Sequence, residues 1–193
     1  IQGSIFGLDL NPFACYLAET NLLIQVLDLL KSARKAGINL VVGRFHVYCG
    51  DSLQVDDAVA SSPDAAILLG KDSAVAELIK ARAGAFEGGF DVLVGNPPYV
   101  RADEESEADN WVKYRRLVEG QRWFTTRHLK WDLYVPFVEQ YGRLLSDRPG
   151  SRACLVTIES IGTAPYAAKL REWLTRQTTV HDCLFTEGLR LFE

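Results

Sequence analysis

The segment Asn96-Pro97-Pro98-Tyr99 directly follows the apolar run FDVLVG and combines groups suited to holding an aromatic amine. Such an amine is a poor nucleophile, because its lone pair is delocalised into the ring. Two acceptors aimed at its two hydrogens would hold it and draw the lone pair out of conjugation. The Asn96 side-chain oxygen and the Pro97 carbonyl are suitable acceptors, Pro98 adds rigidity, and Tyr99 can stack on the ring. The motif therefore predicts methyl transfer through positioning and electrostatics, with a rigid turn without chemistry as the alternative.

Acidic residues stand at the ends of two further strand-like runs. Asp9 lies between an apolar run and a predicted helix, where a carboxylate can accept both hydroxyls of a ribose. Asp51, with Ser52 beside it, follows the next run, where it can accept the exocyclic amine of an adenine. Each acid by itself fits a helix cap or a turn better. Three polar strand ends in succession nevertheless favour a binding edge.

The elements that would position these residues alternate between strand and helix patterns. Asn11 and Pro12 predict the start of the first helix, in which Phe13, Leu17, Ile24 and Leu27 recur at helical spacing. A later helix carries Leu133, Phe137, Tyr141 and Leu144 on one face. We expect strands over Ser4–Leu10, Arg44–Cys49, Phe90–Gly95, Ala153–Ile158 and Val180–Phe185, and helices over Phe13–Arg34, Ser73–Arg82, Asp132–Leu145 and Pro165–Arg176.

This alternation predicts an α/β fold with a mostly parallel sheet and helices on both faces. In such sheets the ligand lies outside the carboxyl ends of the strands, which is where Asp9, Asp51 and Asn96 are expected.

The segment from Trp111 to Trp131 is basic and aromatic, with Glu119 as its only acid. Phosphate contacts combined with base stacking would need such a mixture. An amphipathic segment that covers the core and exposes a basic face fits equally well. The candidate DNA-binding residues are Lys113, Arg115, Arg116, Arg122, Trp123 and Arg127.

Composition limits the other possibilities. A net charge of −4 gives no global support for nucleic-acid binding, so any such site must be local. The four cysteines are scattered and the three histidines lack ligand spacing, so we expect no metal site and a reducing, cytoplasmic location. The apolar runs are short, so we expect no membrane partner.

Several segments together resemble the N6-adenine DNA methyltransferases. They are most similar to the large methylases of restriction-modification systems (type IIG-like) and of phage-exclusion systems. The resemblance covers nearly the whole chain, and its most specific part is GNPPY together with the acidic strand ends. The matching segments are IFGLDLNPFACYLAETNL, GDSL, FDVLVGNPPY, KWDLYVPFVEQYGRLLSDRPGSRACLVTIES and YAAKLREWLTRQTTVHDCLF.

The resemblance implies a Rossmann-like fold that uses S-adenosylmethionine, with double-stranded DNA as substrate and no metal required. Asn96, Pro97, Pro98 and Tyr99 would hold an adenine that has been flipped out of the duplex. A target-recognition domain would lie elsewhere in the parent chain. The residues implied to bind the cofactor are Asp9, Leu10, Asp51, Ser52 and Asn96.

The chain also departs from that family. The glycine-rich cofactor loop and its strand are absent, and would stand before Ile1. A later aromatic motif would stand at or beyond Glu193. We therefore expect residues 1–193 to be a partial catalytic domain, truncated at both ends, with insertions at about 54–89 and 100–130. The isolated fragment is expected to bind the cofactor weakly and to be inactive.

Three alternatives remain open. Methyltransferases that act on a protein glutamine carry the same motif, because a side-chain amide poses the same chemical problem. An RNA amine is a variant of the same class. The fold could also serve as a non-catalytic DNA-binding module, although the intact Asn96–Tyr99 motif argues against decay.

Overall fold

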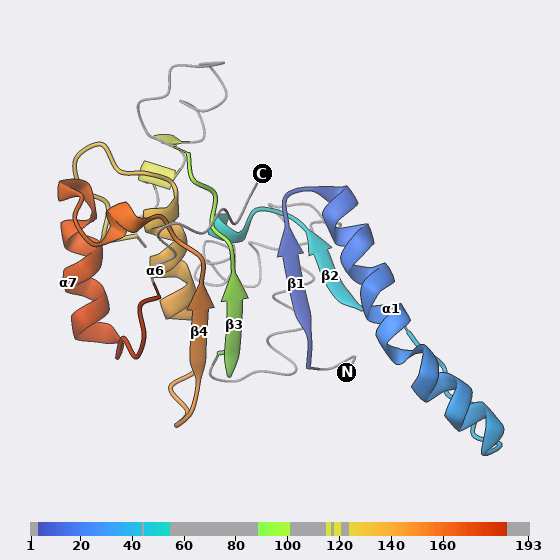
Figure 1. The fold of residues 1–193 in the computed structure, drawn as a ribbon. Coiled ribbons are helices and arrows are strands. Elements are labelled where there is room, and N and C mark those ends of the chain that lie inside the picture. Colours follow the sequence, from blue (N-terminus) through green and yellow to red (C-terminus); the bar gives the residue numbers. More distant parts are fainter. Residues whose placement is uncertain are drawn as a thin grey trace. The chain divides into compact units, whose positions relative to one another are not determined.

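The computed structural model describes residues 4–43, 45–54, 89–100, 115–116, 118–120 and 124–184. The chain divides into two compact units, Ile1–Glu87 and Gly88–Glu193 (Figure 1). The predicted helix Ser73–Arg82 lies outside the described residues.

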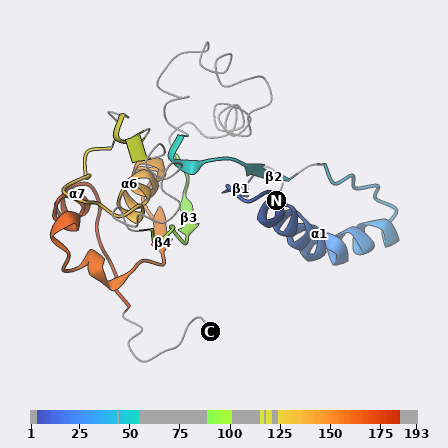
Figure 2. The same cartoon turned by 90° about the horizontal axis from the view of Figure 1, so that it is seen from above.

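The first unit is built on a pair of parallel strands, β1 (Phe6–Asp9) and β2 (His46–Cys49). Phe6 pairs with His46 and Asp9 with Cys49, and the Gly50 N–H extends the ladder by donating to the Asp9 carbonyl at 2.9 Å. Helix α1 (Pro12–Lys35) connects the strands and lies beside both of them (Figure 2). The sequence prediction of a parallel β-α-β unit is confirmed here.

Both ends of α1 follow from local chemistry. The Asn11 side-chain oxygen accepts from the Phe13 N–H at 2.9 Å, and Pro12 occupies the first helical turn. At the other end Gly37 has φ of +73° and donates to Arg34, while Ile38 donates back to Ala33. These two bonds form a Schellman motif, whose left-handed residue favours glycine.

Helix α1 is apolar on two opposite faces. One face packs on the strands, with Cys15 and Val26 against Phe45 and Val47. The residues singled out by helical spacing lie on the other face, where Phe13 is 69%, Leu17 48%, Ile24 54% and Leu27 39% exposed. Spacing predicted the helix correctly but could not identify the buried face, because both faces have the same period.

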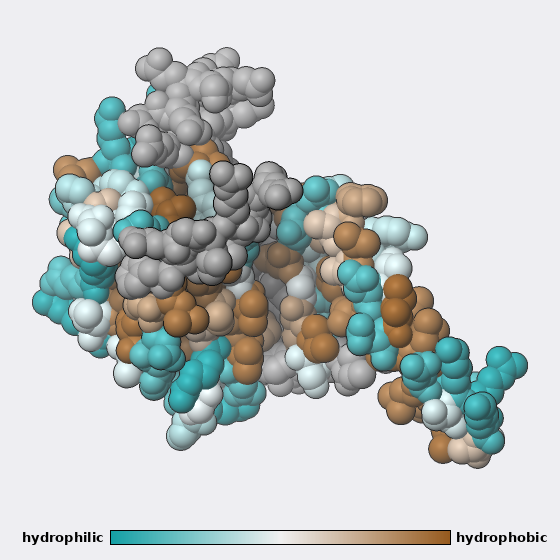
Figure 3. All heavy atoms as spheres, in the orientation of Figure 1, coloured by the Kyte–Doolittle hydropathy of each residue, from teal (hydrophilic) through white to brown (hydrophobic). Residues whose placement is uncertain are grey.

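The outer apolar surface of α1 is visible as brown patches along the helix (Figure 3). By length and composition alone, α1 could also cross a membrane. Apolar core helices of soluble proteins pass the same test, and α1 packs on β1 and β2 through its other face.

The second unit contains another pair of parallel strands, β3 (Val92–Gly95) and β4 (Arg152–Leu155). Helix α6 (Tyr134–Leu144) precedes β4 in the sequence, and helix α7 (Ala168–Gln177) follows it. Short 3-10 turns at Glu159–Ile161 and Pro165–Ala167 join β4 to α7. Two predicted strands and two predicted helices of this region are confirmed, with boundaries shifted by a few residues: Phe90–Gly95, Ala153–Ile158, Asp132–Leu145 and Pro165–Arg176.

The core of the second unit lies around α6. Tyr134, Val135 and Val138 are buried against Leu170 of α7, with Leu155 of β4 at the margin. Of the face predicted for α6, Phe137, Tyr141 and Leu144 are only half-buried. The fully buried positions of the helix include the charged and polar Glu139 and Gln140.

One predicted strand is wrong. Residues 180–184 have no strand pairing, and Val180 and Leu184 are 52% and 91% exposed. A strand needs a neighbour for its backbone N–H and C=O groups, and none of the described strands pairs with this segment. Each described ladder is parallel, while a single sheet covered on both faces stays a prediction.

Candidate active site

The Asn96–Tyr99 segment leaves the carboxyl end of β3 and is held at both ends by backbone hydrogen bonds. The Val156 N–H donates to the Gly95 carbonyl at 3.0 Å, and the Leu133 N–H donates to the Val100 carbonyl at 3.0 Å. Pro97 is buried, whereas Asn96 is exposed. The segment is therefore anchored on both sides, with Asn96 at the surface.

Tyr99 connects this segment to the end of β4. Its hydroxyl oxygen lies 2.6 Å from Asn96 Oδ1 and 2.8 Å from the Val156 carbonyl oxygen. Burial raises the pKa of Tyr99, so the hydroxyl keeps its proton at neutral pH. The side chain is 39% exposed, which leaves part of the ring open for contact with a ligand.

A partly buried polar cluster lies next to the anchor of the segment. The Tyr166 hydroxyl donates to Asp132 Oδ2 at 2.5 Å and is 3.1 Å from the Ser160 hydroxyl. The ring of Tyr134 packs edge-on against Tyr166, and burial raises the pKa of Tyr134. These contacts fix the chain at Leu133, which in turn holds Val100.

Sequence reasoning did not assign a role to Asp132, Tyr166 or the Val156 carbonyl. An acid directly before a predicted helix was a usable sequence signal for Asp132, and the structure shows this residue to be only 5% exposed. No sequence signal marks a backbone carbonyl such as that of Val156.

Another group of hydrogen-bond acceptors lies in the first unit, at the carboxyl ends of β1 and β2. Asp9 closes β1, and its Oδ1 accepts from the Asn11 N–H at 2.7 Å. Asp51 follows β2, and its Oδ1 accepts from the N–H of the buried Leu53 at 2.9 Å. The structure thus brings the two predicted carboxylates to the same end of one strand pair, with Leu10 exposed and Ser52 half-buried beside them.

This pair of acids fits the adenosine part of S-adenosylmethionine in chemical type. Ribose hydroxyls and the adenine amine are donors, and carboxylates without a proton are acceptors only. In the part of the chain that the structure describes, no group of three His, Cys, Asp or Glu side chains is arranged to hold a metal ion.

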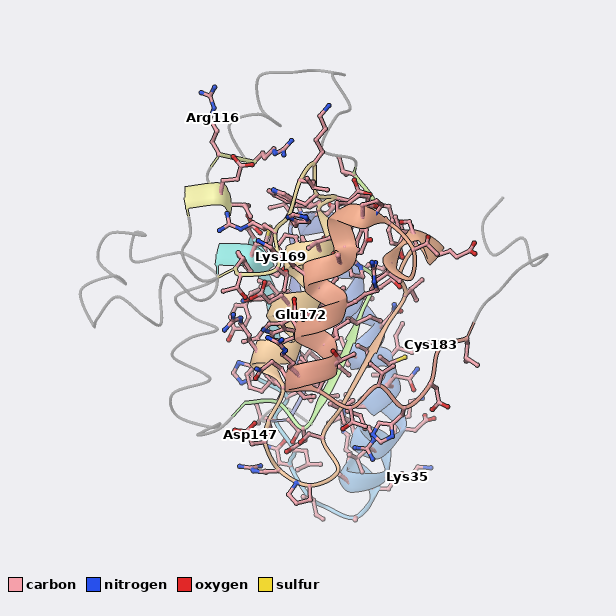
Figure 4. All side chains as sticks on the ribbon, turned by 90° about the vertical axis from the view of Figure 1, so that its left-hand side faces the viewer. Lys35, Arg116, Asp147, Lys169, Glu172 and Cys183 are labelled. Carbon is pink, nitrogen blue, oxygen red and sulfur yellow. The ribbon has the colours of Figure 1, made fainter. Side chains whose placement is uncertain are left out.

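The described basic residues of the Trp111–Trp131 segment have different surroundings. Arg115 pairs with Glu119 at 2.9 Å, and its guanidinium lies 5.3 Å from the centre of the Trp131 ring. Arg116 is exposed and projects away from the ribbon (Figure 4). Lys113, Arg122 and Trp123 lie outside the described residues.

Arg127 is engaged with its own chain. Its guanidinium donates to the Val118 carbonyl at 2.7 Å and to the Phe124 carbonyl at 3.0 and 3.2 Å. Burial lowers the pKa of Arg127, although Glu119 and Glu139 oppose this effect. A contact to DNA by Arg127 remains a prediction, and the geometry supports a structural role.

Glu139 on α6 holds the end of the same segment. Its fully buried carboxylate accepts from the N–H and hydroxyl groups of Thr125 and Thr126 and from Arg143, at 2.6–3.0 Å. Burial by itself would raise the pKa of Glu139, but these donors outweigh it and the pKa is lowered. The carboxylate therefore stays charged and ties residues 124–126 to α6.

The model of the Eco57I restriction-modification methylase family matches residues 3–192. The Type II methyltransferase M.BstVI of Geobacillus stearothermophilus is 36% identical over 87 residues, which are 45% of this chain and 14% of that protein. The chain thus aligns with a small part of the length of this curated relative.

Proposed function

Because the chain belongs to the Eco57I restriction-modification methylase family, we propose that its natural protein methylates the N6 amine of adenine in double-stranded DNA. The observation that carries this proposal is the anchored Asn96–Tyr99 segment at the end of β3. It contains an amide, a proline carbonyl and a partly exposed aromatic residue, which suit an amine on a planar base.

In this proposal the target base is flipped out of the duplex, at a cost of a few kcal/mol. The Asn96 side-chain oxygen and the Pro97 carbonyl accept from the two amine hydrogens, and Tyr99 and Pro98 contact the base. The protein holds the amine in line with the donor and excludes other nucleophiles. After transfer, the extra proton leaves the product ammonium to solvent, so no residue of shifted pKa is needed.

The cofactor in this proposal is S-adenosylmethionine, which supplies an electrophilic methyl group when bound. Asp9 would accept from its ribose hydroxyls, and Asp51 from its adenine amine. Leu10 and Ser52, beside them, would contact the adenosine part, and Asn96 would lie next to the methyl group. A Rossmann-like fold, a cytoplasmic location and a target-recognition domain elsewhere in the parent chain complete the proposal.

The experiment uses the natural protein that contains these residues and S-adenosylmethionine with a labelled methyl group. Duplex DNA, RNA and a release-factor-type protein are offered separately, and mass spectrometry of the digested products identifies the modified group. We expect N6-methyladenine from the duplex and none with Asn96→Ala. Label on cytosine alone, on RNA alone or on protein glutamine would refute the assignment.

A substitution of Asp51 tests the proposed cofactor-binding residues at the ends of β1 and β2. Asp51→Ala is expected to raise the KM for S-adenosylmethionine about tenfold or more, because a hydrogen bond to a charged group contributes ~1.5–3 kcal/mol. Its KM for duplex DNA should stay near that of the unsubstituted protein. A variant with an unchanged cofactor KM would remove Asp51 from the proposed binding site.

A further inference from the structure

The Tyr99 hydroxyl has two short contacts but only one proton. Asn96 Oδ1 is 2.6 Å away and the Val156 carbonyl oxygen 2.8 Å away, and both atoms are acceptors. A single proton can serve only one of these contacts well. The other would bring two oxygen atoms together without a hydrogen between them.

Rotation of the Asn96 amide by 180° resolves the conflict. The oxygen and nitrogen of a carboxamide have nearly the same shape, so their hydrogen-bonding partners decide which is where. With Nδ2 toward Tyr99, the amide donates to the hydroxyl oxygen, and the hydroxyl donates to Val156. Each contact then contains one proton. The 2.6 Å separation is about 0.1 Å below the usual N–H···O range, which a small side-chain rotation relieves.

We propose that the Tyr99 hydroxyl and the Val156 carbonyl position the Asn96 amide through the relay Nδ2–H to Oη and Oη–H to Val156 O. The relay rests on the function proposed above and directs Asn96 Oδ1 away from Tyr99, toward the amine to be methylated. Without it, the amide could turn its NH2 group toward that amine, and two donors would face each other. Tyr99 thus acts in two ways, through its ring on the base and through its hydroxyl on Asn96.

The fold holds the far end of this relay in place. The Val156 carbonyl belongs to the residue directly after β4, and the Val156 N–H is bonded to the Gly95 carbonyl at the end of β3. Gly95 is the residue before Asn96, so the relay closes a ring of contacts between the ends of the two strands. Burial raises the pKa of Tyr99, so its proton stays in the relay at working pH.

The relay also strengthens the acceptor. A carboxamide whose N–H donates to a polarised hydroxyl carries more negative charge on its oxygen, because hydrogen bonds in a chain polarise one another. The oxygen that faces the amine then draws more strongly on the amine hydrogens. This effect acts on the reaction rate and leaves the stacking of the base unchanged.

Tyr99→Phe in the natural protein tests the relay, because it keeps the ring and removes the hydroxyl. We expect the single-turnover rate of methyl transfer to fall about tenfold, as for the loss of one positioning hydrogen bond. Duplex affinity and the fluorescence of 2-aminopurine at the target position should stay within about twofold, because stacking by the ring is retained. Tyr16→Phe, the same change at an exposed residue of α1, should match the unsubstituted protein in every measurement.

A second measurement needs no substrate. In protein labelled with ¹⁵N at asparagine, Asn96→Ala identifies the side-chain amide signals of Asn96. One of these two protons should be shifted and protected from exchange, and Tyr99→Phe should abolish both features while Tyr16→Phe leaves them intact.

The two proposals fail in different ways. If the unsubstituted protein methylates no adenine, the proposed function fails, while the amide signals still test the relay. A Tyr99→Phe protein that methylates adenine at the full rate overturns the relay and leaves the function standing. Asn96 amide signals that do not change in Tyr99→Phe would also overturn the relay.

Discussion

The ring of Tyr141 on α6 packs directly against the backbone of Gly95, the last residue of β3. A Cβ atom on Gly95 would lie 2.5 Å from Cζ and 2.8 Å from Cε1 of that ring, closer than side-chain atoms approach. The glycine therefore lets α6 support the strand at the residue before Asn96. The position of the motif depends on this contact.

Gly95→Ala should consequently disturb the site. We expect methyl transfer to fall about 10- to 100-fold, because small displacements of positioning groups have effects of this size. The free energy of unfolding should fall by about 1–3 kcal/mol from overpacking. Methylation kinetics and denaturant unfolding measure the two effects.

Two further variants control this experiment. Gly7→Ala in β1 places its Cβ 3.4 Å from Val47, an ordinary contact, and should cost much less stability. Adding Tyr141→Ala to Gly95→Ala makes room and should recover part of the lost activity. No recovery in the double variant would show that the backbone conformation of Gly95, and not Tyr141, sets the requirement.

Glu139→Gln should destabilise the second unit by about 2–4 kcal/mol, because it removes the charge from a fully buried, hydrogen-bonded acid. The control is Glu172→Gln on the exposed face of α7, where the pair with Arg176 is open to solvent (Figure 4). That change should stay within about 0.5 kcal/mol. Equal losses in the two variants would contradict the role of burial.

The same carboxylate makes stability depend on pH. The folded pKa of Glu139 lies below its unfolded value of about 4.3, so its contribution is present above that value. The contribution is lost as the pH falls from there through the folded pKa. The stability difference between the unsubstituted protein and Glu139→Gln should thus be constant at neutral pH and shrink below about pH 4. Urea unfolding across this range measures it, and a difference that grows in acid would contradict the lowered pKa.

Gly142→Ala should loosen the packing of α6 on α7. A Cβ there would lie 2.6 Å from the Trp173 ring, which also receives the guanidinium of Arg143 at 5.6 Å. We expect a loss of about 1–3 kcal/mol despite the higher helix propensity of alanine. Gly120→Ala, where a Cβ would meet none of the described atoms within 4 Å, should be neutral or stabilising. Thermal unfolding of both variants measures the difference.

Substitutions of Arg116 and Arg127 should distinguish a residue that contacts DNA from one that stabilises the fold. Arg116→Glu, at an exposed position, is expected to weaken binding to all duplex sequences alike and to lower the salt slope by about 1–2. Arg127→Met should instead lower the free energy of unfolding by about 1–3 kcal/mol, because it leaves the Val118 and Phe124 carbonyls without their donor. Binding titrations at several salt concentrations and denaturant unfolding measure the two effects. If Arg127→Met weakened DNA binding and Arg116→Glu lowered the free energy of unfolding, the two roles would be exchanged.

Local sequence signals were sufficient for most of the described elements and for the motif. Asn11, Pro12 and Gly37 mark the ends of α1 by chemistry that acts within a few residues, and the structure shows those caps. The strand ends at Asp9 and Gly95 were predicted in the same way. Such signals work because backbone hydrogen bonding and dihedral preference are local.

What only the tertiary structure decided is which surfaces and atoms come together. Periodicity could not choose between the two apolar faces of α1, and the strand pattern at Val180 lacked a partner among the described strands. The Tyr99 contact with Val156 and the Gly95 contact with Tyr141 join residues far apart in the chain. The types of residue at the site therefore follow from the sequence by itself. Their orientation follows from packing, because hydrogen bonds and close contacts between distant segments exist only once the chain has folded.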